Sequence, residues 1–193
     1  AAATEDNSDV FMTDLFTPIV ARLEDLSGKK YQEETRAMRI ITDHIKASVM
    51  LITDGVTPSN KFQGYILRRL IRRAILYGRN LGIHNSSDFG NLVEPVAEIY
   101  KDAYPEAVRN LPDTRQKIVE EAERFGKTLE RGLREFEKIQ SIDGKTAFFL
   151  YESFGFPWEM TEEIALQRKQ KIQRMALWNI NQRIKSRKRL LKN

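Results

Sequence analysis

Apolar residues recur at intervals of three and four along nearly the whole chain. This spacing is typical of amphipathic α-helices, because it gathers the apolar side chains on one face of each helix. The sequence therefore predicts an all-α fold, an irregular helical bundle with one long coiled-coil-like helix and no strand pair. The expected helices cover about residues 14–26, 35–53, 61–82, 92–104, 112–140 and 145–154, and a last one begins at Thr161.

Polar residues that cap helices stand at two of the expected starts. Thr13 or Asp14 suits the N-cap of the first helix, and Asn60 suits that of the third. Such side chains accept hydrogen bonds from the free N–H groups of a first helical turn. The turn at residues 54–59 contains Gly55 and Pro58, which separate the second helix from the third.

The third expected helix has one apolar face and one basic face. At 100° per residue, one arc of roughly 140° is apolar and can enter a core. Its members are Ile66, Leu67, Leu70, Ile71, Ala74 and Tyr77. The opposite arc comprises Lys61, Arg68, Arg69, Arg72, Arg73 and Arg79, with Phe62 and Tyr65 among them.

The basic residues of the chain are concentrated in two blocks that contain no acid. Residues 55–87 hold six Lys or Arg, and residues 164–193 hold ten, although the formal net charge is only +5. Within the third helix no acid stands at i±4 to neutralise the arginines. We therefore expect an arginine ridge that is turned outward, without carboxylates nearby, to contact a polyanion.

The long helix carries apolar residues at coiled-coil spacing. This seam comprises Ile118, Ala122, Phe125, Leu129, Leu133, Phe136 and Ile139. A continuous seam of this kind packs either against the rest of the chain or against a helix of a partner.

Several kinds of chemistry have no support in the residues. The chain has no cysteine, which excludes disulfides and zinc ribbons, and its two histidines do not make a metal-binding spacing. His44 stands beside Asp43 within a helix and is interpreted as a hydrogen-bonded structural residue. The segment Gly144–Thr146 matches the end of a phosphate-binding loop, but Ile139 replaces the glycine that such a loop requires. We expect no catalytic residue and no metal site.

No apolar run approaches the ~18 residues of a membrane span. The first nine residues have neither the basic start nor the apolar segment of a signal peptide. The sequence therefore predicts a cytoplasmic protein without a membrane partner. Residues 1–11 are expected to be a flexible lead, 12–169 a helical domain, and 170–193 a basic tail that is helical or disordered.

Seven segments, taken together, resemble alanyl-tRNA synthetase. They occur in that family's order and at about its spacing, over roughly residues 12–169. They are Thr13–Phe16, Arg39–Lys46, Asp54–Asn60, Gly64–Arg73, Thr128–Leu133, Gly144–Phe148 and Leu150–Pro157.

The resemblance implies the helical tRNA-recognition segment that follows the class II catalytic domain. The parent enzyme would be a ligase that uses ATP and Mg to attach alanine to tRNA in protein synthesis. This chain would lack the adenylate-forming site, would hold no cofactor and would be inactive alone. Its implied partners are the acceptor stem of tRNA(Ala) and the missing class II catalytic domain.

The resemblance also implies roles for particular residues. Asn60 and Glu152 would approach the edges of a G·U wobble pair in the acceptor stem. Glu152 stands where the family has Asp, and Gln63 stands where it usually has Arg. The residues implied to hold tRNA phosphates, or to brace the adjacent domain, are Lys61, Arg68, Arg69, Arg72, Arg73 and Arg79.

Two other functions remain open on the sequence. A non-enzymatic helical interaction module would use the long seam to bind a partner helix, and its basic face would only be solvated. Sequence-specific DNA binding is the second, although a compact helix-turn-helix pair is missing.

Overall fold

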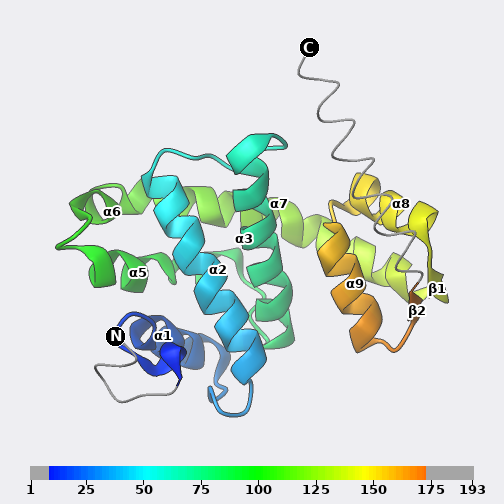
Figure 1. Cartoon of the computed structure of the whole chain (residues 1–193), viewed down its shortest axis with the longest axis horizontal. Coiled ribbons are helices and arrows are strands. Elements are labelled where there is room, and N and C mark those ends of the chain that lie inside the picture. The colour runs from blue at the N-terminus through cyan, green and yellow to red at the C-terminus, as the bar shows by residue number, and fades with distance from the viewer. Residues whose placement is uncertain (1–8, 173–193) are drawn as a thin grey trace. The chain divides into compact units, whose positions relative to one another are not determined.

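The computed structural model describes residues 9–172, and they form two compact units that divide between Glu123 and Arg124. The all-α class expected from the sequence is confirmed (Figure 1). The division falls within one long helix, inside the segment that the sequence treats as one domain. Each unit is described by itself.

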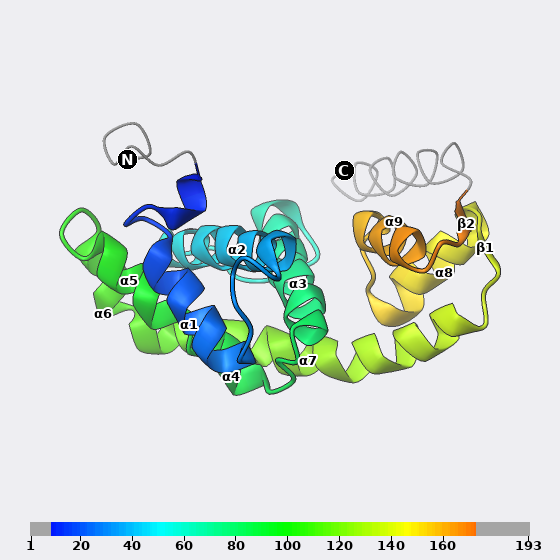
Figure 2. The same ribbon diagram turned by 90° about the horizontal axis from the view of Figure 1, so that it is seen from below.

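The first unit is built from short and long helices that surround an apolar core (Figure 1). Its elements are η1 (Val10–Met12), α1 (Thr17–Ser27), α2 (Thr35–Thr53), α3 (Phe62–Asn80), α4 (Ser86–Gly90), α5 (Val93–Tyr100), α6 (Pro105–Arg109) and the first part of α7 (Leu111–Glu137). The most extensive packing joins α2 to α3, which lie side by side in Figures 1 and 2.

The core of the first unit forms because the apolar stripes of its helices face one another. Its largest side chains are almost completely buried: Ile19, Leu23, Met38, Ile41, Ile45, Leu67, Ile71, Leu81 and Phe89. The bounds expected for the second helix, residues 35–53, are confirmed by α2.

The first helix begins later than the sequence predicts. Neither Thr13 nor Asp14 caps it, because α1 starts at Thr17 and its N-cap residue is Phe16. The hydroxyl of Thr13 instead donates to the carbonyl of Val10 at 2.7 Å and closes the turn of η1.

The helix expected over residues 92–104 ends early, at Tyr100. Helix α5 ends at Tyr100, and α6 starts at Pro105. The residue before a proline resists helical geometry, and Tyr104 accordingly has φ −136° and ψ 71°. Proline is then well placed in the first turn of the next helix.

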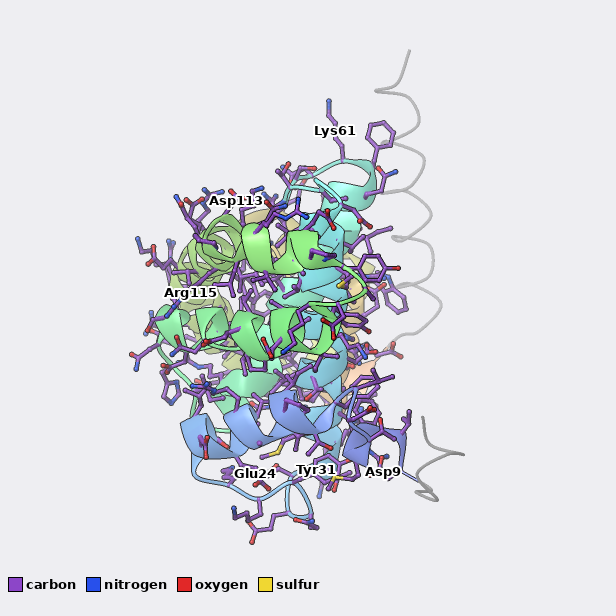
Figure 3. All side chains as sticks on the ribbon, turned by 90° about the vertical axis from the view of Figure 1, so that its left-hand side faces the viewer. Asp9, Glu24, Tyr31, Lys61, Asp113 and Arg115 are labelled. Atoms are coloured by element: carbon purple, nitrogen blue, oxygen red, sulfur yellow. The ribbon has the colours of Figure 1, made fainter. Side chains whose placement is uncertain are left out.

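Residues 9–11 make specific contacts within the first unit, whereas the sequence predicts a flexible lead over residues 1–11. Asp9 caps η1 by accepting a hydrogen bond from the Phe11 amide at 3.1 Å. The same carboxylate accepts from the Tyr31 hydroxyl at 2.6 Å and from Arg39 at 2.8 Å. Figure 3 labels Asp9 and Tyr31 where this contact joins η1 to the segment before α2. The contacts join residues 22 and 30 positions apart, which local patterns do not reveal.

The second unit contains the remainder of α7, followed by β1 (Ser141–Ile142), α8 (Gly144–Phe154), α9 (Trp158–Gln167) and β2 (Lys171–Ile172). Its core is aromatic, and the rings of Phe125 and Phe156 meet edge to face with centroids 6.1 Å apart. Gly132 makes room for Phe156, because a Cβ atom there would lie 2.8 Å from the ring carbon Cε1. Helix α9 begins at Trp158, three residues before the expected Thr161.

A short parallel ladder corrects the expectation that the fold contains no strand pair. Ser141 pairs with Lys171, and Ile142 pairs with Ile172. Two residues per strand are too few for a period of two to appear in the sequence. The first residues of the expected basic tail are therefore extended in β2, and residues 173–193 lie outside the described part of the chain.

Over residues 9–172, none of the helices is long and apolar enough to cross a membrane.

Candidate nucleic-acid interface

The loop before α3 is held by Ser59, and Asn60 is not the N-cap that the sequence predicts. The hydroxyl of Ser59 accepts from the Lys61 amide at 3.2 Å and donates to the Lys61 carbonyl at 3.0 Å. The N-cap position belongs to Lys61, without a side-chain cap. The Asn60 side chain is therefore available for other contacts.

Gly64 allows this loop to lie directly on the first turn of α3. The Ser59 amide donates to the Gly64 carbonyl at 3.0 Å. A Cβ atom at Gly64 would lie 2.9 Å from the Ser59 Cβ atom and closer still to the carbonyl oxygen of Thr57. The close approach fixes Asn60 and Lys61 at an exposed loop tip.

Two arginines of the predicted ridge meet one buried carboxylate. Arg72 Nε donates to Oε1 of Glu121 at 2.7 Å, and Arg68 Nε lies 3.4 Å from the same oxygen. Glu121 is 1% exposed, and the arginine side chains are only 17–18% exposed. The expectation of an outward ridge without nearby carboxylates is therefore wrong for Arg68 and Arg72.

The physical reason is that Glu121 belongs to α7, 49 residues after Arg72. Neutralisation sought only at i±4 within α3 cannot detect it. The carboxylate nevertheless balances only one of two guanidinium charges, so this cluster of three residues keeps a formal charge of about +1. Within the described part of the chain, Glu121 Oε2 accepts no hydrogen bond.

Arg73 contacts the buried histidine. Its guanidinium lies 3.0 Å from Nε2 of His44, whose Nδ1 lies 2.9 Å from the Asp43 carboxylate. The guanidinium can only donate, so Nε2 accepts and Nδ1 donates to Asp43, which makes the imidazole neutral. The interpretation of His44 as a hydrogen-bonded structural residue is confirmed.

The remaining basic residues differ in exposure. Lys61 is exposed, and its side chain extends away from the ribbon in Figure 3. Arg69 and Arg79 are half-buried. The apolar arc is also narrower than expected, because Ile66 is 46% exposed and Leu70 is only half-buried.

Asn60 is brought into the arginine cluster by its carbonyl. Its Oδ1 atom accepts a hydrogen bond from an Nη atom of Arg68, eight residues later in α3. The assignment of oxygen and nitrogen follows from this contact, since a guanidinium needs an acceptor. The Asn60 amide nitrogen therefore carries the donors that this exposed side chain can offer elsewhere.

Glu152 lies on α8 in the second unit and is exposed. Asp143 starts this helix by accepting a hydrogen bond from the Thr146 amide at 2.8 Å. That amide N–H lowers the pKa of the Asp143 carboxyl below its ordinary value. The segment Gly144–Thr146 is thus the first turn of a capped helix. Gln63 is exposed at the start of α3.

Glu121 is the functional candidate that the sequence interpretation missed. A signal for it exists, because Glu121 follows Ile118 by three positions and precedes Phe125 by four. Both neighbours belong to the buried seam of α7. A carboxylate on such a stripe indicates a buried acid that needs a cationic partner.

The family model of tRNA synthetases class II (A) matches residues 1–192. The chain belongs to this family. Among its curated relatives are alanine–tRNA ligases from Borreliella afzelii, 44% identical over 86% of this chain, and from Nitrosococcus oceani, 42% identical over 88%. A third, from Thermus thermophilus, is 41% identical over 87%. The chain spans 30% of the first relative's length and 20% of the other two.

Proposed function

We propose that this chain is the tRNA acceptor-stem recognition segment of an alanine–tRNA ligase. Its family membership and its alanine–tRNA ligase relatives support the class of substrate. Adenylate formation with ATP and Mg would belong to the remainder of the ligase, with which this segment would act. On this proposal the isolated chain binds tRNA but does not charge it.

The observation that carries the proposal is the exposed loop tip at Asn60 and Lys61. Asn60 offers amide donors at a position fixed by Ser59 and Gly64, and Lys61 adds a positive charge next to them. A-form RNA displays base edges and 2′-hydroxyls in a wide, shallow minor groove that such a tip can enter. The amide would read an edge while the ammonium contacts a phosphate.

Glu152 supplies complementary chemistry. A carboxylate only accepts hydrogen bonds, and the guanine 2-amino group is the distinctive donor of a minor groove. Glu152 would therefore accept a hydrogen bond from the 2-amino group of the guanine of a G·U pair. The glutamate keeps the charge of the family's aspartate on a side chain that is longer by one methylene.

The six basic residues divide between contacts inside the first unit and contacts proposed with RNA. Arg68 and Arg72 brace Glu121, and Arg73 braces His44. Lys61 is the exposed cation and is proposed to hold a phosphate. Arg69 and Arg79 are proposed to add to the positive field of α3 near the phosphate backbone of the RNA.

The rival interaction module would need an open seam on α7. Instead, Ile118, Phe125, Leu129 and Phe136 are completely buried by the chain itself, and Ala122 is 2% exposed. Leu133 and Ile139 are half-buried. The burial favours the tRNA proposal over a helix-binding role for this seam.

The proposal is tested by the binding of acceptor-stem RNA duplexes that differ only in a G·U or a G·C pair, at two salt concentrations. Wild-type chain should prefer G·U, and Asn60→Ala should lose about 1–3 kcal/mol of that preference, the range of a paired edge contact in DNA. Lys61→Ala should weaken the binding of both duplexes and reduce the salt slope, the slope of log affinity against log salt concentration, by about one unit. Equal affinity of wild-type chain for both duplexes would contradict edge reading, and stronger binding of duplex DNA would favour the DNA-binding alternative.

Glu152 has its own test, because inosine lacks only the 2-amino group of guanine. Glu152→Ala should weaken binding of the G·U duplex and leave binding of an I·U duplex unchanged. An equal loss on both duplexes would contradict the assignment of Glu152 to the amino group.

A further inference from the structure

A series of contacting side chains links the buried interior of the first unit to the exposed loop tip. Glu121 on α7 holds Arg68, whose Nε lies 3.4 Å from Oε1, and Arg68 donates through Nη to Oδ1 of Asn60. Exposure rises along this series, from 1% at the Glu121 side chain to 18% at Arg68 and to the exposed Asn60. Glu121 is therefore the member of the series with the least access to water.

Removing the partners of Glu121 would leave a buried charge without compensation, so its pairing with arginine is strongly favoured. Arg72 Nε donates to the Oε1 atom of Glu121 at 2.7 Å, so one oxygen of the carboxylate is held independently of Arg68. A guanidinium is planar and keeps its donors at set angles. The Nε atom of Arg68 makes no hydrogen bond to the described residues, but its ion pair with Glu121 restricts the direction in which Arg68 presents its Nη donors.

We propose that Glu121 is a positioning residue that orients the Asn60 amide through Arg68. The proposal rests on the proposed function, since it specifies how that site obtains its selectivity. The Asn60 carbonyl is occupied by Arg68, so the amide turns its N–H donors toward the ligand. The oriented amide then favours a hydrogen-bond acceptor at one fixed place, and the uracil O2 of a wobble pair is displaced from the position that the cytosine O2 takes in a G·C pair.

This assignment separates Arg68 from an ordinary phosphate contact. A phosphate-binding arginine contributes charge, and lysine replaces much of that contribution. A positioning arginine needs the fork, because one Nε faces Glu121 while a second nitrogen reaches Asn60. Lysine has a single nitrogen and cannot do both.

The first test is spectroscopic and needs no RNA. In the 193-residue chain, the side-chain amide resonances of Asn60 are assigned by their loss in Asn60→Ala. Glu121→Gln and Arg68→Lys should both shift them toward the positions of solvated asparagine. The matched control is Glu123→Gln, which makes the same charge change at an exposed position on the same helix. Unchanged Asn60 resonances in Arg68→Lys would overturn the proposal that Glu121 orients Asn60 through Arg68, which is called the relay below.

The second test measures discrimination between the G·U and G·C duplexes at two salt concentrations. Arg68→Lys keeps the net charge, so its salt slope should equal that of wild type while its preference for G·U falls about fivefold or more, the low end for a lost edge contact. Glu121→Gln should lose preference similarly, and Glu123→Gln should keep it.

The outcomes distinguish this inference from the proposed function. If wild-type chain binds neither duplex or shows no preference, the proposed function fails, and the spectroscopic test alone decides the relay. If wild type discriminates and Arg68→Lys discriminates equally well, the relay is overturned and the proposed function stands. An unchanged salt slope with intact preference in Arg68→Lys is the result expected of a phosphate contact, because lysine replaces the charge.

Discussion

At the scale of single residues, three arginines of the first unit contact partners far along the chain. Arg72 reaches Glu121, Arg73 reaches His44, and Arg39 reaches Asp9. Charge counted along the sequence identifies these residues as unusual but does not identify their partners. A positive segment can therefore be structural in part and still leave an excess charge for a ligand.

Arg72 should contribute more to stability than an arginine in a surface pair. Arg72→Met leaves Glu121, which is 1% exposed, with only the more distant Arg68, and should cost about 1–3 kcal/mol of unfolding free energy. The control is Arg109→Met, because Arg109 and Glu106 are 69% and 53% exposed and such pairs contribute about 0–1 kcal/mol. Urea unfolding measures both, and equal losses would contradict the structural role of Arg72.

The contact of Asp9 should make the attachment of η1 dependent on pH. Burial raises the pKa of the Asp9 carboxyl, but hydrogen bonds from Tyr31 and Arg39 outweigh it and hold the pKa below the ordinary 3.8. A carboxyl with a lowered folded-state pKa stabilises the fold above its unfolded pKa, and this stabilisation is lost as the pH falls through the folded pKa.

The urea midpoint of wild type should therefore exceed that of Asp9→Asn at pH 7, and the difference should shrink as the pH drops below about 4. A difference that stays constant down to a pH of about 2 would show that ionised Asp9 does not make the contact.

At the scale of helices and turns, periodicity predicts the long elements well. Helix α2 has the expected bounds, and the seam of α7 is largely buried, as its spacing indicates. The errors occur where one residue competes with a pattern, as at Tyr104 before Pro105, or where Ser59 replaces Asn60 in closing the turn. Such choices depend on atomic contacts that a repeat of apolar residues does not encode.

Two glycines should respond to alanine with opposite signs. Gly64→Ala places a Cβ atom against Ser59 and Thr57 and should destabilise the first unit by about 1–3 kcal/mol. Gly126 lies within α7, and a Cβ atom there would meet open space, so Gly126→Ala should stabilise the helix by about 0.5–1 kcal/mol. Thermal unfolding compares them, and stabilisation by Gly64→Ala would contradict the packing of the loop.

At the scale of the whole molecule, fold class and family follow from the sequence, while the construction of the candidate site does not. Asn60 is conspicuous in its motif, yet its carbonyl is engaged by Arg68 and indirectly by Glu121. That arrangement joins three positions spread over α3, its preceding loop and α7. The division of the chain between Glu123 and Arg124 places Asn60 and Glu152 in different units.

The most direct measurement compares wild type with Asn60→Asp for binding of the G·U and G·C duplexes at the same salt concentration. Aspartate keeps an oxygen for Arg68 but removes the amide donors. Wild type should prefer G·U, and Asn60→Asp should remain folded and lose that preference. A wild type that binds both duplexes equally, or an Asn60→Asp variant that discriminates as well as wild type, would contradict the account.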